Sequence, residues 1–505
     1  MQPSLPDVKY FLGYDLGSSS IKAALLEAES GKPLASAFSP STEMKIHSPS
    51  PGFAEQDPEH WWLELIHATR LLHQKFPFNK NEIGAIGISY QMHGLVCIDK
   101  NNQPLRPAII WCDSRAVNYG ELAFDEMGHD YCLEHFLNSP GNFTASKLKW
   151  VKENEPEIYR KTVRILLPGD FIALKMTGEA ATTVTGLSEG IFWDYKENGI
   201  ANSLLEYYGL DKSLLAPCVP VFGEQGRLQK DAAEALGISE GITVCYRAGD
   251  QPNNAFSLQV LETGEIAATA GTSGVLYGIS SKPEYDPKSR VNPFVHVNHQ
   301  IDHPRFGILM CLNGTGILNS WLRREFFPDE SYETMNAGAA ITPLGAEGIS
   351  CYPFGNGAER ILENKNPGGQ IKGLDFNRHN KYHLARAAQE GIVFSLIYGA
   401  EIMQGMGLSM NRFRAGNANM FLSGLFSQTF ADCSGCPVEL YNSDGAIGAA
   451  RAAGYGKKFY LEFSDCFRGM ELIRLVEPDK NNSERIKEIY DLWKKGLEEI
   501  LKSEK

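Results

Sequence analysis

The stretch AGDQPNNAFSLQVLETGEIAATAGTSGV, residues 248–275, begins with an isolated carboxylate, Asp250, and ends in a turn of small residues. This pattern predicts Asp250 on a tight turn, followed by a strand that opens into a Gly/Thr/Ser loop. Loop amides and hydroxyls can cradle phosphate oxygens, and a carboxylate can accept the proton of an attacking hydroxyl. Two ordinary turns would use the same residue types. By itself the stretch leaves both interpretations open.

Residues 10–26 (YFLGYDLGSSSIKAALL) predict a β-hairpin whose first strand carries Asp15 near its end. The predicted turn consists of Gly17, Ser18, Ser19 and Ser20. A carboxylate beside such a turn can hold Mg²⁺ and the phosphates that it bridges, although a Gly-Ser turn that binds nothing is the alternative. The pattern of strand, small-residue turn and strand recurs at residues 268–278. This recurrence predicts two similar halves, each contributing one hairpin to a cleft between them.

The length of 505 residues exceeds what one hydrophobic core supports and predicts two large domains. We place them at 1–247 and 248–478, with residues 479–505 as a C-terminal helix on the body. The net charge of −13 argues against a nucleic-acid partner but not against a nucleotide. No apolar stretch is long enough to span a membrane, and the start does not resemble a signal peptide. Ten scattered cysteines are expected to be reduced thiols, so we expect a cytoplasmic protein.

Residues 83–89 (IGAIGIS) predict a short buried strand, and the polar residues of YQMHG follow at its carboxyl end. Ligands of open α/β sheets bind outside such strand ends, so a polar pocket is expected there. The alternative is a core histidine at position 93 and a gap-filling Met92. Further along, Asp113 and Arg115 could bind a polar ligand or pair with each other. Lys147 and Trp150 carry no role that the sequence reveals.

Several other segments have simple local interpretations. Asp57-Pro58 is typical of a helix start, and residues 33–54 read as irregular surface chain. Gly314 and Gly316 would allow close backbone approach, and residues 421–426 predict a strand turning into a helix that could face phosphate or ribose. The small residues of 443–454 favour a helix used for packing. Residues 483–501 predict a helix whose apolar face carries Ile486, Ile489, Trp493, Leu497 and Ile500.

The chain resembles the FGGY family of carbohydrate kinases along nearly its whole length. The matching motifs are DLGSSS (15–20), EQDPEHWW (55–62), ISYQMHG (88–94), LRPAIIWCDSR (105–115), FTASKLKWV (143–151), GDQ (249–251), AGTSGV (270–275) and the stretch 369–390. Four places depart from the family pattern: Tyr90, Gln251, the first residue of the signature at 142–154, and the nucleotide turn, which is reduced to LSGLFS at 422–427.

The resemblance implies an α/β, two-domain, actin-like (ribonuclease H-like) ATPase fold in which ATP, Mg²⁺ and a sugar meet in a central cleft. It implies Asp250 as catalytic base, with Asp15 and Asp250 serving the metal. The implied sugar-binding residues are Gln91, Met92, His93, Gly94, Asp250 and Gln251. The implied nucleotide-binding residues are Gly17, Ser18, Ser19, Ser20, Gly271, Thr272, Ser273, Gly314, Ser423, Gly424 and Gln428.

The activity expected from the resemblance is ATP-dependent phosphorylation of a ketopentose, D-xylulose, to its 5-phosphate. Another ketose or polyol such as sedoheptulose is the alternative within the class. A non-catalytic sugar sensor is the alternative from another class. Retention of both Asp15 and Asp250 argues against the sensor, which needs neither. No membrane partner is expected, and the chain is expected to act alone or as a homodimer.

Overall fold

The computed structural model describes residues 8–503, which form two compact units. Within the described residues, unit 1 comprises 8–259, Phe294–Asp302 and Ser443–Met470, and unit 2 comprises Val260–Pro293, His303–Asn442 and 471–503. The division expected from the sequence was contiguous, with boundaries after residues 247 and 478. The structure differs because two later segments of the chain return to pack within unit 1.

A five-stranded sheet forms the centre of unit 1. Its order is β13 (Thr243–Gly249), β5 (Ile83–Tyr90), β1 (Tyr10–Leu16), β2 (Ile21–Glu27) and β3 (Pro33–Ser39). β1 and β2 form the predicted antiparallel hairpin, while β5 and β13 run parallel to β1 and place their carboxyl ends at one edge. Residues 33–39 were expected to be irregular. They form the edge strand, where a proline at the first position sacrifices no ladder hydrogen bond.

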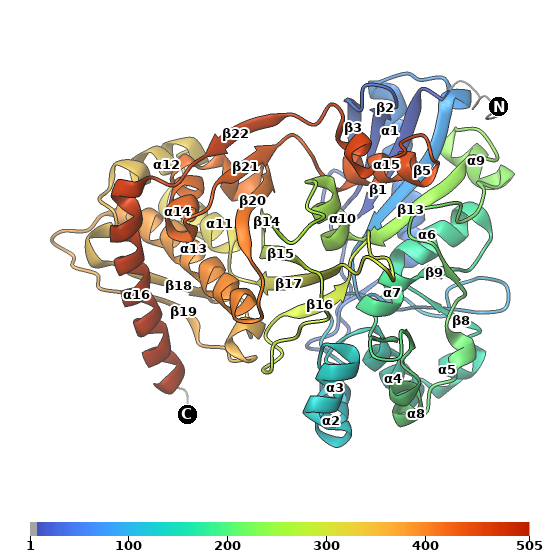
Figure 1. The fold of residues 1–505 in the computed structure, drawn as a ribbon, viewed down its shortest axis with the longest axis horizontal. Coiled ribbons are helices and arrows are strands. Elements are labelled where there is room, and N and C mark those ends of the chain that lie inside the picture. Colours follow the sequence, from blue (N-terminus) through green and yellow to red (C-terminus); the bar gives the residue numbers. More distant parts are fainter. Residues whose placement is uncertain (1–7, 504–505) are drawn as a thin grey trace. The chain divides into compact units, whose positions relative to one another are not determined.

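The helix α15 (Gly445–Gly456) packs on this sheet, which explains the return of Ser443–Met470 to unit 1 (Figure 1). Two strand glycines make the close approach possible. A Cβ atom at Gly13 would lie 1.9 Å from the Ala446 carbonyl oxygen, and one at Gly87 would lie 2.0 Å from that of Ala449. The packing role predicted for this helix of small residues is confirmed.

Helix α1 (Pro58–Lys75) begins as the sequence predicts, because the Asp57 side chain caps it by accepting a hydrogen bond from the Glu59 amide. Helix α10 (Asp250–Ser257) corrects another prediction, because Asp250 opens a helix rather than a turn that leads directly into a strand. Further helices of unit 1 are α2 (Val117–Met127), α3 (His129–Phe136), α4 (Thr144–Asn154), α5 (Pro156–Lys161), α6 (Pro168–Thr177), α7 (Val184–Glu189), α8 (Asn202–Tyr208) and α9 (Lys230–Leu236).

The central strands of unit 2 repeat the topology of unit 1. The order is β17 (Phe306–Leu312), β15 (Gly274–Ser280), β14 (Gly264–Ala270), β20 (Met410–Gly416), β21 (Val438–Tyr441) and β22 (Leu472–Val476). β14 and β15 form the second predicted hairpin, and β20 and β21 continue the sheet in parallel with β14. Both recurring hairpins therefore exist, one in each unit.

Five longer helices surround this sheet within unit 2: α11 (Gly316–Phe326), α12 (Tyr332–Ile341), α13 (Lys381–Gly405), α14 (Gly424–Ser434) and α16 (Lys480–Ser503). The predicted apolar face of the last helix is confirmed, except that Tyr490 rather than Ile489 is fully buried. The strand expected before α14 is instead a 3-10 turn, Asn419–Leu422. No helix within residues 8–503 is long and apolar enough to cross a membrane, and the ten cysteines form no disulfide.

Candidate active site

Asp15 is held at the centre of the unit 1 sheet by its two neighbouring strands. Lys22 lies opposite it on β2 and Ser89 beside it on β5. The Ser89 hydroxyl donates to Asp15 Oδ1 at 2.7 Å, and burial raises the pKa of the Asp15 carboxyl. Lys22 also donates to Asp444 Oδ2 at 3.1 Å. Asp444 caps α15 and was not identified from the sequence, because a capping residue before a packing helix has an ordinary structural interpretation.

Asp250 is the first residue of α10 and follows directly on β13, whose last residue pairs with Tyr90 at the end of β5. Burial, followed by the negative charge of Asp15, raises the pKa of the Asp250 carboxyl to about 7. Hydrogen bonds from the backbone and side chain of Gln251 oppose this shift. A carboxylate with a pKa near neutrality is suited to accept a proton from a hydroxyl.

The two carboxylates could serve a Mg²⁺ ion together with oxygen ligands from a substrate. Residues 8–503 contain no group of three or more His, Cys, Asp or Glu side chains that could hold a metal by themselves. Mg²⁺ typically uses one or two carboxylates and fills its remaining positions with phosphate oxygens and water. A Cβ atom at Gly445 would lie 2.5 Å from Asp15 Oδ2, so a larger residue at position 445 would collide with the Asp15 carboxylate. The donor set fits such an ion.

His93, in the motif that follows β5, is held by contacts to its backbone and its ring. Its φ of 61° lies in the left-handed region, which is uncommon for a residue with a side chain. Lys147 Nζ donates to the His93 carbonyl oxygen at 2.8 Å, and the Glu189 carbonyl oxygen lies 2.9 Å from His93 Nδ1. The ring packs edge-on against Phe143 at 4.8 Å and tilted against Phe294 at 5.4 Å. The imidazole is thus fixed in orientation.

Glu189 supplies a third carboxyl that the sequence did not reveal. It is buried, and a Cβ atom at Gly249 would lie 2.5 Å from its Oε2 and 2.6 Å from the Met92 side chain. Burial first, and then the charge of Asp250, raise the pKa of Glu189 well above its usual value. The only signal was a charged residue inside the otherwise apolar segment LSEGIFW, residues 187–193.

Gln91 connects the predicted sugar-binding motif, residues 90–94 (here called the sugar motif), to the first hairpin. Its Nε2 donates to Gln56 Oε1 at 3.4 Å, and Gln56 Nε2 donates to the Ser18 carbonyl oxygen at 2.7 Å. The Gly17 amide donates to the Ser20 carbonyl, which closes the turn, and Ser19 accepts from the Met44 amide. Gly94 is required by packing, because a Cβ atom there would lie 2.6 Å from Pro168. Gln251 lies partly exposed beside Asp250.

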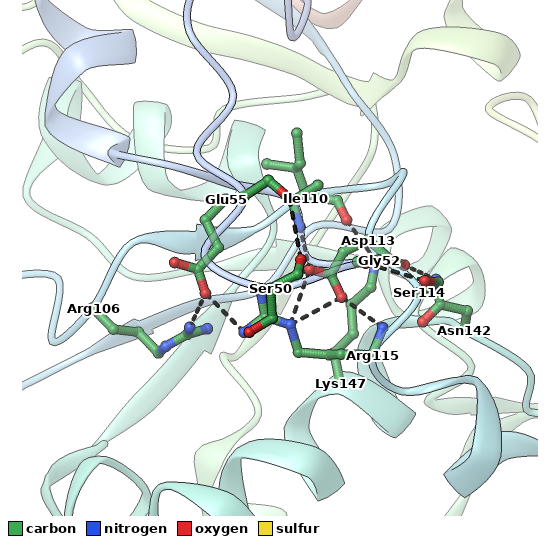
Figure 2. A network of polar contacts seen from close by, with 12 residues as sticks. Ser50, Gly52, Glu55, Arg106, Ile110, Asp113, Ser114, Arg115, Asn142 and Lys147 are labelled. Atoms are coloured by element: carbon green, nitrogen blue, oxygen red, sulfur yellow. Dashed lines mark hydrogen bonds and ion pairs between the residues drawn. The ribbon is translucent and has the colours of Figure 1, made fainter.

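Lys147 and its neighbours form the polar network of Figure 2. Asp113 pairs with Arg115 at 2.7 Å, so the mutual pairing that the sequence left as one alternative is present. Arg115 also contacts Glu55 at 2.7 Å, and its guanidinium lies 4.7 Å from the Trp150 ring centroid. Lys147 donates to the Ile110 carbonyl as well as to that of His93, so the network supports the loop that carries the sugar motif.

Unit 2 contains a cavity of about 350 Å³ beside its hairpin turn. It is lined by Ala270, Gly271, Thr272, Gly316, Asn319, Ser320, Tyr332, Asn336, Asn419, Met420, Leu422 and Ser423. The Gly316 amide donates to the Gly271 carbonyl at 2.8 Å, which brings the start of α11 against the turn. Backbone amides and neutral side chains dominate this lining, as suits a nucleotide held without compensating cations.

The structure separates the predicted nucleotide residues of unit 2 into two groups. Gly271, Thr272 and Ser423 line the cavity. Ser273, Gly314, Gly424 and Gln428 are absent from its lining. A Cβ atom at Gly314 would lie 1.5 Å from the Pro353 carbonyl oxygen, so this glycine serves packing. Gln428 donates to Asp432 at 2.8 Å and to the Glu477 carbonyl at 2.9 Å, which ties α14 to the chain before α16.

Known proteins resemble the chain over its whole length. Residues 10–257 match the N-terminal domain of the FGGY family of carbohydrate kinases, and residues 266–456 match its C-terminal domain. Xylulose kinase of Bacillus subtilis (strain 168) is 29% identical over 514 residues, covering 98% of this chain and 99% of its own.

Two solved structures show the same fold. Xylulose kinase from Rhodospirillum rubrum has a TM-score of 0.84 at 23% identity, covering 96% of this chain and 97% of its own. Gluconate kinase from Lactobacillus acidophilus has a TM-score of 0.87 at 21% identity, covering 98% of each chain.

Proposed function

Because the chain belongs to the FGGY family of carbohydrate kinases, we propose that it transfers the γ-phosphoryl group of ATP to D-xylulose, forming D-xylulose 5-phosphate. The observation that carries this proposal is Asp250, a carboxyl with a pKa of about 7 beside the sugar motif. The similarity to xylulose kinases over nearly the full chain supports the choice of sugar. Fold alone does not select it, since a gluconate kinase shares this architecture.

In the proposed reaction Asp250 accepts the proton of the sugar hydroxyl that attacks the phosphoryl group. His93 and Gln91, with Met92 and Gln251 beside them, orient the sugar. Phosphoryl transfer involves little covalent work by the protein, so positioning and charge neutralisation supply most of the catalysis. Asp15, with Asp250, would hold Mg²⁺, which neutralises phosphate charge when bound. Gly271, Thr272 and Ser423 bind the nucleotide, and the turn at 17–20 contributes further phosphate contacts.

The decisive experiment is coupled ADP release against D-xylulose, D-ribulose, L-ribulose, sedoheptulose, gluconate, glycerol and no sugar. Strong release with D-xylulose and little with the others is expected. Release with a different sugar would keep the kinase chemistry and refute the substrate. Sugar binding without ADP release from any acceptor would refute the enzyme and support a sensor. Asp250→Asn, purified in the same way, serves as the control for the background of the assay, because its turnover should be lower by about 10²-fold or more.

A further inference from the structure

A chain of three polar side chains leads from the start of α14 into the cavity of unit 2. Ser423 caps α14, where its Oγ accepts from the Phe426 amide at 3.3 Å. The same hydroxyl donates to Gln389 Oε1 at 2.8 Å. Gln389 Nε2 in turn donates to Asn336 Oδ1, also at 2.8 Å. Gln389 is fully buried in α13, and both Ser423 and Asn336 line the cavity.

The hydrogen-bond donors in this chain point in one consistent direction. Ser423 Oγ accepts from a backbone amide and gives its single proton to Gln389 Oε1, whereas a reversed Gln389 amide would take this acceptor away from the buried Ser423 proton. That bond fixes the Gln389 amide with its Nε2 toward Asn336. Asn336 must then accept through Oδ1, which turns its Nδ2 away from Gln389. Within residues 8–503 no hydrogen bond from Asn336 Nδ2 is found, and Asn336 lines the cavity, so this donor is available to a ligand bound there.

The surroundings of Asn336 suit a heteroaromatic base. Tyr332 lies one helical turn earlier on α12 and lines the same cavity, with its hydroxyl 3.2 Å from Ser320 Oγ. Met420 and Leu422 add apolar surface. Apolar walls with a few fixed polar groups are typical of small-molecule sites, in which the polar groups decide orientation and specificity.

We propose that Asn336 is a specificity-determining residue that donates through Nδ2 to a ring nitrogen of adenine. Gln389 is a positioning residue that keeps this donor directed at the base. The inference rests on the proposed function only in taking ATP as the phosphoryl donor. Without the hydrogen bond from Gln389, the Asn336 amide could turn either Nδ2 or Oδ1 toward the base. With that bond, Oδ1 is engaged and Nδ2 is left to face the base.

The test is calorimetric binding of ATP and its 1-deaza, 3-deaza and 7-deaza analogues, without sugar, to the full-length protein and to Asn336→Ala. One analogue should bind about 3- to 10-fold more weakly than ATP, as expected for one neutral hydrogen bond. That difference in affinity should vanish in Asn336→Ala, because this variant lacks the Nδ2 donor that would bind the ring nitrogen absent from the analogue. If Asn336→Ala leaves the discrimination against all three analogues unchanged, the proposal is overturned. Asn377→Ala, an exposed asparagine outside the cavity, is the matched control.

Two further variants test polarity and positioning. Asn336→Asp keeps an acceptor for Gln389 but places an oxygen where Nδ2 stood, so it should weaken ATP binding more than Asn336→Ala. Gln389→Met keeps Asn336 but frees its amide, so it should lose part of the discrimination against the sensitive analogue. Wild-type discrimination in Gln389→Met would overturn the positioning role, and equal or tighter ATP binding by Asn336→Asp would overturn the donor role.

These measurements require no turnover. A failed sugar assay would leave them interpretable, and their failure would leave the proposed kinase reaction intact.

Discussion

The two hairpins share a topology but differ in chemistry. In each unit an antiparallel pair ends in a small-residue turn, and a parallel strand flanks the first member. The next-to-last residue is Asp15 on β1 and Thr269 on β14. Lys22, Asp444, Glu189 and Asp250 lie around the first hairpin in unit 1, whereas the cavity beside the second is lined by neutral residues. One architecture thus carries a charged site and a neutral one.

The difference suits the roles proposed for the two sites. Proton abstraction needs a carboxylate near neutral pKa, and burial of several carboxyls together raises their pKa values. A nucleotide already carries its own negative charge and can be held by amides and hydroxyls. Mutations in unit 1 should therefore act on the chemical step and on the sugar, and mutations beside the second hairpin on nucleotide affinity.

The largest effect is expected from Asp250→Asn, which removes the proton acceptor but keeps nearly the same shape. Turnover should fall by about 10²- to 10⁴-fold. Sugar and ATP affinity, measured by calorimetry, should change little. Near-normal turnover would show that Asp250 is not the base. It would also contradict the assignment of the chemical step to the charged site of unit 1.

Asp15→Ala comes next, because it deletes the carboxylate opposite Lys22. We expect roughly a 10- to 100-fold loss of activity, with a raised Mg²⁺ concentration needed for half-maximal rate. A Mg²⁺ titration of initial rates provides the measurement. An unchanged metal dependence would count against assigning the ion to the charged hairpin.

The pH dependence of kcat/KM should distinguish the charged site of unit 1 from the neutral cavity of unit 2. Since the pKa of Asp250 is raised to about 7, the base is protonated below neutrality and ionised above it. The kcat/KM for sugar should therefore fall about tenfold per pH unit below 7 and level off above it. ATP affinity should not change between pH 7 and about 8, because the cavity lining, among the residues that the structure describes, contains no acidic, basic or histidine side chain. A rate profile that is flat between pH 5 and 7 would contradict the role given to Asp250.

The smallest expected effect concerns Lys147, which supports His93 by donating to its carbonyl oxygen. Lys147→Met removes one hydrogen bond from the partly buried His93 carbonyl and one from the Ile110 carbonyl, which keeps its bond from the Asp113 amide, at a total cost of about 1–3 kcal/mol in the free energy of unfolding. The KM for sugar should rise several-fold and the KM for ATP should not. Thermal denaturation and initial rates provide the measurements.

Lys149→Met is the matched control on the same helix, since Lys149 makes only an i,i+4 pair with Glu153 at the surface. Equal increases in both KM values for Lys147→Met would show that Lys147 supports the fold as a whole rather than the sugar side.

Much of this protein could be predicted from local sequence. Both hairpins, the buried strand β5, the capped start of α1 and the apolar face of α16 follow from residues a few positions apart. The motifs of the FGGY family added the kinase class, because they combine many short patterns in a fixed order. The helix at Asp250 was missed since GDQPNN carries turn-forming residues, and tertiary packing overrode that local preference.

The tertiary structure alone decided how distant side chains combine. Lys22 meets Asp444 across 422 positions, Lys147 meets His93 across 54, and Gln389 meets Asn336 across 53. No local periodicity encodes such pairs, because each depends on which strand ends and helix faces the fold brings together. Sequence therefore determined the elements and the family. The raised pKa of Asp250, the fixed His93 and the direction of the Asn336 amide arise from burial and partners that exist only in the folded chain.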